Sequence, residues 1–456
     1  MPSYFAEAVR LPNGWALDVR LHVDADGIIA AVEPGASAAG AERLSGPVIP
    51  GMPNLHSHAF QRAMAGLAER GSHTGDTFWT WRQTMYRFLE RLTPEDNRAI
   101  ACQLYVEMLK GGYTTVGEFH YLHNDPQGHA YMDPASMASG ILSAAQEAGI
   151  GLTLLPVLYM TGSFDGRPLV GGQRRFAHTP DSVLRLTEKL LGEAPPEVRV
   201  GLAPHSLRAV PLDAMREALA GLDALDRHAP IHIHVAEQPG EVADCLAASG
   251  KRSVELLLDS MDVTPRWTLI HATHMTEAET RRAAATGATV GLCPSTEANL
   301  GDGLFQFLTF LEAGGAFGIG TDSHVSLDAR EELRWLDYGQ RLRSGKRAMP
   351  VMGDAHVGAR LWLAAVAGGA RSLGHATGHI TVGHRADLLV LDPDHPSLAG
   401  REGDQLLDAL VFVNAGASPI RHVMARGRMV IADGRHPDEE AIAARYRAAL
   451  SRLLAE

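Results

Sequence analysis

Eight short apolar segments that alternate with longer helix-like segments constrain the fold of this chain more than any other feature. Most of these segments are uninterrupted apolar runs, which is typical of strands covered on both faces. Repeated β–α alternation predicts a parallel sheet covered by helices, and eight such units over residues 49–377 predict a (β/α)8 TIM-type barrel. The predicted strands are 47–55, 113–118, 151–157, 198–203, 230–236, 267–271, 288–293 and 316–321.

The two ends of the chain have a different pattern from the middle. Residues 1–48 contain alternating stretches interrupted by Asp-Gly and Pro-Gly, and the same pattern returns in residues 378–435. We therefore expect these two segments to form one small β-sandwich beside a catalytic barrel of residues 49–377. The last residues, 436–456, have the periodicity and composition of a helix.

The composition restricts the partners and the location of the protein. Its 45% hydrophobic and 21% charged residues are ordinary for a soluble enzyme, and a net charge of −12 argues against a nucleic-acid partner. Three widely spaced cysteines contain no CxxC motif, so we expect no disulfide framework and a cytoplasmic location. The N-terminus lacks the pattern of a signal peptide, and no apolar run of about 18 residues predicts a membrane span.

Histidines and acidic residues stand at the ends of four predicted strands. Because the active site of a (β/α)8 barrel lies at the C-terminal ends of its strands, these side chains are expected to meet at one mouth. His56 and His58 are two residues apart, so both imidazoles can point to the same face of a strand. The whole set is His56 and His58 on the first strand, His234 and Glu237 on the fifth, His271 on the sixth and Asp322 on the eighth.

This set of side chains indicates metal-assisted hydrolysis of a C–N bond. Imidazole and carboxylate ligands suit zinc, and an incomplete protein shell leaves a position for water, whose pKa the metal lowers towards neutrality. Glu237 is placed to carry protons from the water to the leaving group. His271 suits the role of a positioned group at the developing charge.

The same pattern resembles the amidohydrolase superfamily. An HxH motif follows the first strand, HxxE lies on the fifth, a histidine on the sixth and an aspartate on the eighth, and "GHITVGHRADLLVLD" resembles the superfamily's return into its β-sandwich. The resemblance implies that His56, His58, His234 and Asp322 bind the metal. It also implies that Asp322 accepts a proton from the water.

The resemblance further implies a single metal ion. Binuclear members of the superfamily bridge two metals with a carboxylated lysine at the end of the fourth strand. Here that strand reads "VRVGLAPHSL", and the four lysines of the chain all lie elsewhere. We therefore expect one divalent ion, Zn²⁺, as in the deaminase branch.

Longer motifs resemble one family within the superfamily, the formimidoylglutamate deiminases of histidine degradation. They are "NLHSHAFQRAMAGLAE", "FWTWRQTMYRF", "HIHVAEQPGEV", "CPSTEANLGDG" and "GIGTDSHVSL", and the resemblance runs over essentially the whole chain. It implies hydrolysis of the amidine group of N-formimino-L-glutamate to N-formyl-L-glutamate and ammonia. It also implies a homodimer.

A dicarboxylate amidine substrate needs groups that bind carboxylates, and arginine binds them bidentately. Arg208, three residues after His205 at the end of the fourth strand, is the first candidate, and Arg82 is the second. By resemblance to the family, Gln61, Tyr121, His205 and Arg208 contact the glutamate part of the substrate.

Other residues near the strand ends are expected to have supporting roles. The aromatic segment 71–95 is long for a connection between a strand and a helix, which favours a lid over the mouth, with Trp79 and Trp81 packing inside it. His232 shares a strand face with His234, but the HxxE spacing favours His234 as the ligand. His324 is expected to lie next to the ligands without binding the metal.

Two alternatives remain at this stage. The first is another mononuclear deaminase of the superfamily that acts on guanine, adenosine or a triazine, whose pocket would favour stacking and amide groups over arginine. Arg208 beside His205 argues against that pocket. The second is a non-catalytic amidohydrolase-like binding protein, although such chains usually lose metal ligands that this chain keeps.

Overall fold

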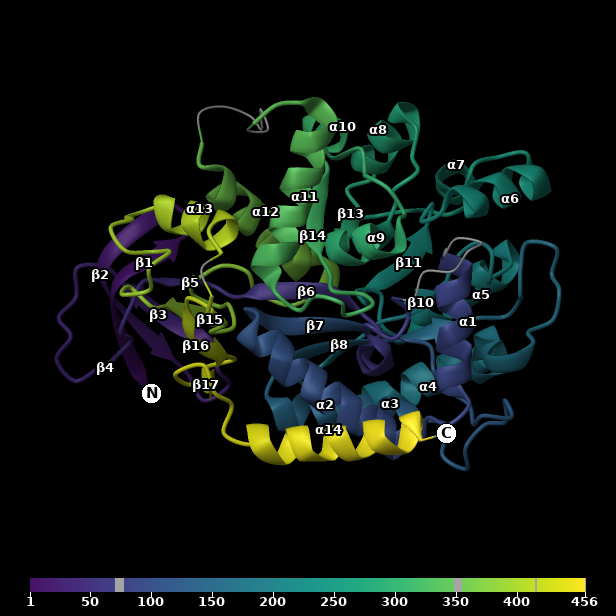
Figure 1. The fold of residues 1–456 in the computed structure, drawn as a ribbon, viewed down its shortest axis with the longest axis horizontal. Helices are drawn as coiled ribbons and strands as arrows, with labels where there is room; N and C mark the ends of the chain where they lie inside the picture. The colour runs from purple at the N-terminus through teal and green to yellow at the C-terminus, as the bar shows by residue number, and fades with distance from the viewer. Residues whose placement is uncertain (70–77, 348–354, 415, 456) are drawn as a thin grey trace.

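The computed structural model describes residues 1–69, 78–347, 355–414 and 416–455, with no side-chain description for residues 78–80. Two sheets organise the chain. A parallel barrel occupies the middle, and a mixed sheet built from both ends of the chain lies beside it, at the left of Figure 1. This arrangement confirms the predicted fold class.

The barrel is a closed ring of parallel strands. In one direction from β6 the order is β7, β8 and the short pair β9 and β10, and in the other it is β14, β13, β12 and β11. Backbone bridges from Leu202 to Ile231 and from Ser206 to His234 join the two ends. The strands are β6 (Met52–Ser57), β7 (Tyr113–His120), β8 (Gly151–Leu158), β9 (Arg199–Val200), β10 (Ala203–Pro204), β11 (Ile231–Val235), β12 (Trp267–His271), β13 (Thr289–Leu292) and β14 (Ala316–Ile319).

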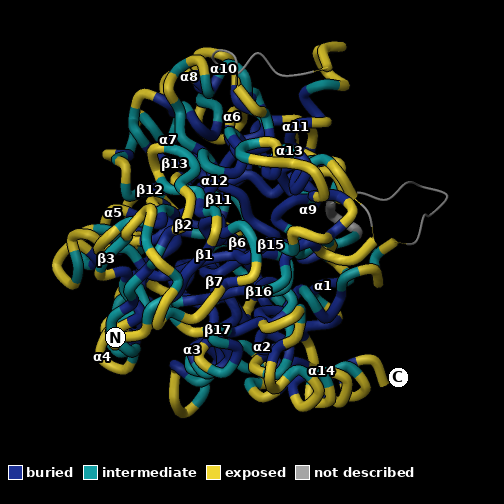
Figure 2. Tube along the Cα trace, turned by 90° about the vertical axis from the view of Figure 1, so that its left-hand side faces the viewer, coloured by how far each residue is buried: buried dark blue, intermediate teal, exposed yellow. Residues whose placement is uncertain are grey.

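Burial explains why the strand segments read as continuous apolar runs. Every residue of β6, β7, β8, β11, β12 and β13 is buried, because helices cover one face and the barrel interior the other. In Figure 2 the strands β6, β7 and β11 lie in the dark blue centre of the molecule. A small group in the interior, Leu55, Ile270, Cys293 and Leu373, packs together.

Two predicted strands are divided in the structure because the backbone changes its hydrogen-bond partner. The segment 47–55 is β5 (Val48–Pro50) followed by β6: the Gly51 N–H donates to Asp387 O, and the Met52 N–H donates to Gly112 O. The segment 198–203 is divided into β9 and β10, since the Gly201 N–H donates to β8 and the Leu202 N–H donates to Pro230 O on the β11 side.

The second sheet combines residues from both ends of the chain. Its order is β17-β16-β15-β5-β1-β2-β3, with β4 paired to β1, and it has its own apolar core. The antiparallel β1–β2 and β15–β16 pairs are joined through β5. Its strands are β1 (Ser3–Leu11), β2 (Gly14–Val23), β3 (Ile29–Glu33), β4 (Glu42–Arg43), β5, β15 (Leu388–Leu391), β16 (Ile420–Ala425) and β17 (Arg428–Ile431).

Local signals set where several helices begin and end. Thr93, Thr179 and Thr276 form N-terminal capping boxes, and left-handed glycines follow the helices that end at Ala148, Ser249, Leu300, Ser344 and Leu373. The helices are η1 (Ala59–Met64), α1 (Phe78–Leu89), α2 (Pro94–Lys110), α3 (Ser136–Ala148), η2 (Gly171–Phe176), α4 (Pro180–Glu193), α5 (Leu212–Leu225), α6 (Pro239–Ser249), α7 (Ser253–Ser260), α8 (Glu277–Ala285), α9 (Pro294–Leu300), α10 (Phe307–Glu312), α11 (Ala329–Ser344), α12 (Val357–Leu373), α13 (Gln405–Phe412) and α14 (Glu439–Leu454).

The C-terminal end of α12 closes the end of the barrel opposite the mouth. A Cβ at Gly368 would collide with the carbonyl of Phe317, so only glycine permits this close approach of α12 to β14. His232 Nε2 lies 3.0 Å from Ser372 O, and Thr153 Oγ1 donates to Leu373 O at 2.8 Å. His232 is therefore held at the closed end of the barrel, one layer below His234.

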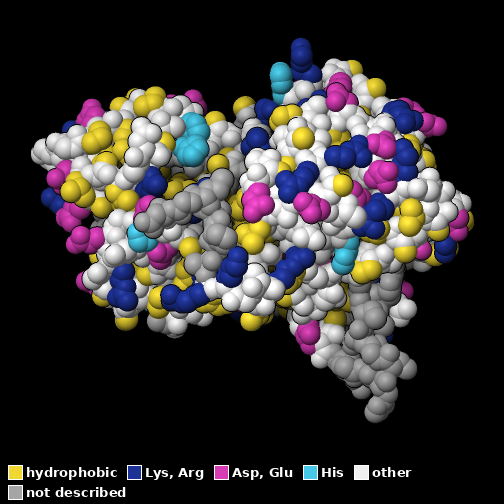
Figure 3. Space-filling model, turned by 90° about the horizontal axis from the view of Figure 1, so that it is seen from above, with side chains coloured by type: hydrophobic (Ala, Val, Ile, Leu, Met, Phe, Trp, Pro, Cys, Tyr) yellow, Lys and Arg dark blue, Asp and Glu magenta, His cyan; other side chains and the backbone are white. Residues whose placement is uncertain are grey.

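The C-terminal helix α14 lies along α2, below the barrel in Figure 1. Lys110 Nζ on α2 pairs with Glu439 Oε1 on α14 at 2.7 Å. On the face shown in Figure 3, basic side chains lie among acidic ones. Within the described ranges, no helix is both long enough and apolar enough to cross a membrane.

Candidate metal centre and substrate pocket

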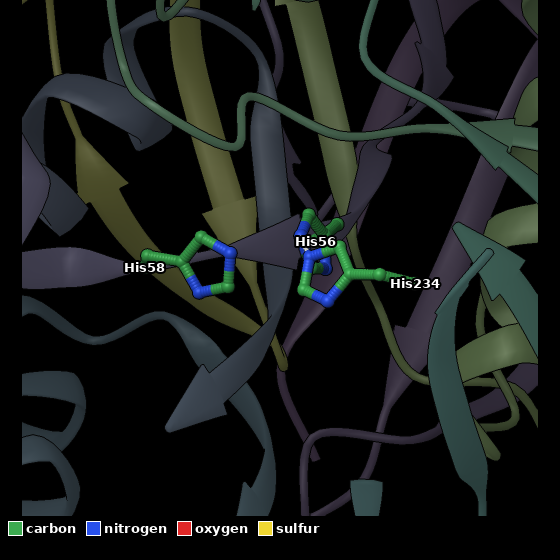
Figure 4. A group of neighbouring side chains, drawn as sticks. All are labelled: His56, His58 and His234. Carbon is green, nitrogen blue, oxygen red and sulfur yellow. Dashed lines mark hydrogen bonds between the residues drawn. The ribbon is translucent and has the colours of Figure 1, made fainter. Parts of the chain in front are cut away.

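The four predicted metal ligands converge at the mouth of the barrel. His56 Nε2 lies 3.1 Å from His234 Nε2 and 3.5 Å from Asp322 Oδ1. His58 Nε2 lies 3.3 Å from the same Asp322 oxygen. Figure 4 shows His58 and His234 pointing toward one another, with the His56 ring beside His234. The strands bring these residues together because the Asp322 N–H donates to His56 O and the His234 N–H donates to His205 O.

Hydrogen bonds to the backbone orient two of the three imidazoles. The Nδ1 atoms of His58 and His234 lie 3.0 and 3.1 Å from the carbonyl oxygens of Phe119 and His205. An Nδ1–H that donates to a carbonyl leaves the Nε2 lone pair for a metal. Burial, reinforced for His56 and His234 by neighbouring histidines, lowers the pKa of all three rings, which favours the neutral form that binds metals. The donor set therefore fits a divalent cation.

The backbone at these strand ends adopts unusual conformations. Five non-glycine residues after or at the ends of β11, β12 and β14 have positive φ angles between 45° and 65°. Such left-handed conformations cost roughly 1 kcal/mol or more each and collect at functional sites. The residues are Ala236, His271, Ala272, Asp322 and His324.

A buried carboxyl group that the sequence analysis missed, Glu118, holds the His56–His58 segment. Glu118 is 2% exposed and ends the predicted strand 113–118. Its Oε1 accepts from the Ala59 N–H at 2.6 Å, and its Oε2 accepts from Ser57 Oγ at 2.6 Å and Tyr105 OH at 3.2 Å. Burial raises the pKa of Glu118 to about 7. The sequence feature that could have identified Glu118 is an acidic residue at the end of an apolar strand.

Glu237 and His271 face each other beside Asp322. His271 Nε2 lies 3.8 Å from both Glu237 Oε1 and Asp322 Oδ2, and its Nδ1 lies 3.2 Å from Glu297 Oε1. Burial alone would lower the pKa of His271, but Glu237 and Glu297 outweigh it and raise that pKa to about 10. Burial raises the pKa of Glu237 to about 7. Glu297, within the "CPSTEAN" motif, was also missed as a partner of His271.

The substrate-contact candidates line one cavity next to the metal ligands. The cavity has about 540 Å³ of empty space, which includes open solvent at its mouth, and its lining contains His58, His234, Glu237, His271 and Asp322. His56 lies behind this lining and is fully buried. The predicted substrate contacts Gln61, Arg82, Tyr121, His205 and Arg208 all line the same cavity.

Part of the segment 71–95, the helix α1, forms part of this cavity. Within it, α1 supplies Trp81, Arg82, Met85 and Tyr86 to the lining, so Trp81 does more than pack inside a loop. Residues 71–77 and the Trp79 side chain lie outside the described part of the chain. The lid therefore stays a prediction.

Polar groups of the cavity form a pair and a group of three. Gln61 Nε2 donates to Tyr121 OH at 2.7 Å. Arg82 Nη2 and Arg208 Nη1 both donate to Tyr159 OH, each at 3.0 Å. Tyr159 follows β8 directly and was not singled out from the sequence, because a tyrosine after an apolar strand is an ordinary packing residue.

The other histidines considered from the sequence lie around the ligands. His324 Nε2 accepts from the His58 N–H at 3.3 Å, so it supports the ligand pair, as expected. His274 Nε2 lies 2.7 Å from Asp302 O. His120 ends β7, and its ring lies 5.2 Å from the ring of His123, which follows in the loop; both are buried.

The closed barrel with its histidine and aspartate cluster is the fold and site of an amidohydrolase, and the chain belongs to the amidohydrolase family. The model of that family matches residues 48–430. A model described as the N-terminal domain of formimidoylglutamate deiminase HutF matches residues 1–46.

Individual proteins give a narrower assignment. A formimidoylglutamate deiminase from Pseudomonas aeruginosa is 53% identical over 459 residues, covering 100% of both chains. The crystal structure of an amidohydrolase from Brucella melitensis matches with a TM-score of 0.93 and 45% identity, again over 100% of both chains. An adenosine deaminase from Xanthomonas campestris with bound zinc shares the fold, with a TM-score of 0.81 and 24% identity over 99% and 98% of the two chains. Within the amidohydrolases, the chain belongs to the formimidoylglutamate deiminases, which confirms the resemblance seen in the sequence.

Proposed function

We propose that this enzyme hydrolyses N-formimino-L-glutamate to N-formyl-L-glutamate and ammonia in histidine degradation. The observation that carries the proposal is one cavity in which a histidine and aspartate cluster faces two guanidinium groups. Such a cavity suits a substrate with a hydrolysable carbon at one end and carboxylates at the other. The 53% identity to a formimidoylglutamate deiminase supports the same substrate.

We also propose that the enzyme uses one divalent ion, Zn²⁺. Imidazole nitrogens and carboxylate oxygens are donors that suit a zinc ion with a position left for water. Such atoms from His56, His58, His234 and Asp322 lie close together. When bound, the ion supplies Lewis acidity that lowers the pKa of a water molecule and polarises the substrate.

The remaining residues move protons and position the substrate. Water adds to the amidine carbon, and Glu237 and Asp322 are the carboxylates close enough to accept its protons. Glu237 delivers the proton taken from the water to the imino nitrogen, which becomes an amine. When the C–N bond breaks, the hydroxyl proton of the tetrahedral carbon passes to that amine, and ammonia leaves the formyl product.

His271 stabilises the charge that develops at the reacting carbon. Its Nδ1–H is directed to Glu297, and its Nε2 has no hydrogen-bond partner within the described part of the chain. Because His271 lines the cavity beside Glu237, a donor at Nε2 is available to the substrate.

Measuring ammonia release from N-formimino-L-glutamate, guanine and adenosine tests the proposal. We expect turnover of the formimino compound alone. Arg208→Ala serves as a variant that should raise KM for this substrate while the protein keeps its metal. Turnover of a purine with no turnover of N-formimino-L-glutamate would replace this proposal with a purine deaminase.

A cytoplasmic homodimer is also part of the proposal. The three cysteines are free and buried, which suits a reducing compartment. Sedimentation of the purified protein at several concentrations tests the dimer, and a monomer throughout the range would contradict it.

A further inference from the structure

Two buried glutamates occupy the same position in two helices but bind different parts of the backbone. Glu241 and Glu279 are the third residues of α6 and α8. Glu279 accepts from the N–H of Thr276, the residue that caps its own helix, at 2.7 Å. Glu241 reaches past the cap of α6 and accepts from the Ala236 N–H at 3.0 Å and the Glu237 N–H at 3.1 Å. Glu241 therefore binds the turn that carries Glu237.

We propose that Glu241 is a positioning residue that fixes the backbone of Glu237 and so holds the proton-carrying carboxylate at the reacting carbon. The inference rests on the proposed function and adds a residue to it. Among the residues that the structure describes, the cavity lining contains Glu237 but not Glu241. Glu241 therefore acts through Glu237 and does not touch the substrate.

The turn between β11 and α6 needs such an acceptor because its backbone is strained. Ala236 has a φ of 52°, in the left-handed region that is costly for a residue with a Cβ. Its N–H and the next one both donate to the Glu241 carboxylate, as in the backbone nests that bind anions. The Ala236 C=O accepts from the His274 N–H at 3.0 Å. Both polar groups of the strained residue are thus satisfied, and Glu241 supplies one of the two partners.

The charged form of Glu241 is the one that fits this turn. Each of its two oxygens accepts from one N–H, whereas a protonated carboxyl group would present an O–H donor at one of them. Burial raises the pKa of Glu241, and the hydrogen bonds from the two N–H groups oppose that rise. Hydrogen bonds to a charged acceptor are roughly twice as strong as those between neutral groups, so the pair stabilises the turn against its strain.

The Glu237 carboxylate depends on its backbone for its position. Within the described part of the chain, the hydrogen bonds of Glu237 are made by its main chain, and its Oε1 lies 3.8 Å from His271 Nε2. A carboxylate that takes a proton from water and gives it to the imino nitrogen changes partners during the reaction, so permanent side-chain hydrogen bonds cannot fix it. Its precise placement has to come from the main chain, and a displacement of about 1 Å can cost about 10²-fold in rate.

The test removes the acceptor with Glu241→Ala and keeps one of its two carboxyl oxygens with Glu241→Gln. Glu279→Ala is the matched control, because Glu279 has the same position in its helix, is also buried and also accepts a backbone N–H, but binds the cap of its own helix. Zinc content, thermal unfolding, kcat and KM are measured for every variant.

Glu241→Ala is expected to lower kcat by about 10- to 100-fold and to keep KM within about twofold of the wild type, because the substrate contacts stay in place. Glu241→Gln should lose less, and both should keep their zinc. Glu279→Ala should be less stable than the wild type but keep its kcat. A wild-type kcat in Glu241→Ala, an equal loss of kcat in Glu279→Ala, or a loss of zinc that accounts for the lower kcat would overturn the proposal.

A double-mutant cycle shows whether Glu241 acts through Glu237. If it does, removing Glu241 costs nothing further once Glu237 has lost its function, so Glu237→Gln should have the same kcat with and without Glu241→Ala. A structural role elsewhere in the site would lower kcat by the same factor in both backgrounds, which would contradict the proposal. The cycle is run on whichever of N-formimino-L-glutamate, guanine and adenosine the wild type hydrolyses.

Hydrogen exchange separates this inference from the proposed function, because it needs no turnover. Mass spectrometry with fragmentation follows the Ala236 and Glu237 N–H groups, which should exchange about tenfold or more faster in Glu241→Ala and at the wild-type rate in Glu279→Ala. Unchanged exchange in Glu241→Ala would reject the role of Glu241. Faster exchange together with the same kcat losses in an enzyme that hydrolyses guanine but not N-formimino-L-glutamate would reject only the proposed substrate.

Discussion

Replacing Glu118 tests how the barrel holds His56 and His58. Its two carboxyl oxygens accept hydrogen bonds from the Ala59 N–H, the Ser57 hydroxyl and the Tyr105 hydroxyl. Glu118→Ala removes both acceptors. Glu118→Gln keeps one oxygen for the Ala59 N–H, and its amide group can donate to the two hydroxyls, which accept as well as donate.

Two opposing effects on the free energy of unfolding distinguish Glu118→Gln from Glu118→Ala. Burial raises the pKa of Glu118 from 4.5 to about 7, so the buried carboxylate costs about 3 kcal/mol of stability at pH 8. Both variants relieve this cost. Glu118→Ala also leaves three buried donors without their acceptor, at about 1–3 kcal/mol each. We therefore expect Glu118→Gln to be as stable as the wild type or more so at pH 8, and Glu118→Ala to be less stable by a few kcal/mol.

The pH dependence follows from the same shift. Because the folded-state pKa of Glu118 lies above its unfolded value, its favourable contribution is complete below pH 4.5 and is lost as the pH rises through about 7. Glu118→Gln should not lose stability in this way as the pH rises. Urea unfolding of the metal-free wild type and variant between pH 6 and 8 measures the difference in stability.

Metal affinity is the decisive assay. Groups that orient metal ligands typically contribute 10- to 100-fold to affinity, so Glu118→Ala should bind Zn²⁺ at least about tenfold more weakly in competition with a chromophoric chelator. Glu118→Gln should lie much closer to the wild type. Wild-type zinc affinity in Glu118→Ala would refute the reasoning that Glu118 holds the ligand pair.

Three further predictions concern the proton carrier, the metal and a buried histidine. Glu237→Gln should keep its metal, measured by elemental analysis, but lose about 10²-fold or more in kcat, because an amide carries no proton between water and nitrogen; near-wild-type kcat would remove Glu237 from this role. Removing the metal with a chelator should abolish turnover, and adding Zn²⁺ should restore it; activity that survives in metal-free protein would contradict the proposed metal chemistry. Burial lowers the pKa of His120 from 6.5 to about 3. As the pH drops below 6.5, the histidine is therefore protonated in the unfolded chain but not in the folded protein. Stability should fall by about 2 kcal/mol at pH 5 for this reason. Unfolding at pH 7 and pH 5 should show a smaller difference for His120→Asn, and an equal difference would rule out this contribution.

The barrel was predictable because each strand carries its own signal. The runs at 113–118, 151–157 and 267–271 are buried on both faces, so their apolar character does not depend on which strand lies next to them. The divided strands at 47–55 and 198–203 were not predictable. Their breaks occur where the backbone changes partners, which depends on neighbouring strands.

The metal-ligand candidates were predictable for a similar reason. His56 and His58 share a strand face through a two-residue spacing, and the rule that strand ends meet at one mouth joins them to His234 and Asp322. The roles of Glu118 and Glu297 were not predictable. A buried carboxyl group is recognised only when the donors around it, such as the Ala59 N–H, are known.

The sequence by itself determined the fold class, the family and the strand ends at which the chemistry is placed, because these follow from local periodicity and from residue types at short spacings. Only the tertiary structure decided that Arg82, 77 residues from Tyr159, and Arg208, 49 residues from it, donate to the same oxygen. That convergence depends on how α1 and the loop after β10 pack over the mouth. No periodicity in the sequence indicates contacts between side chains that are so far apart in the chain.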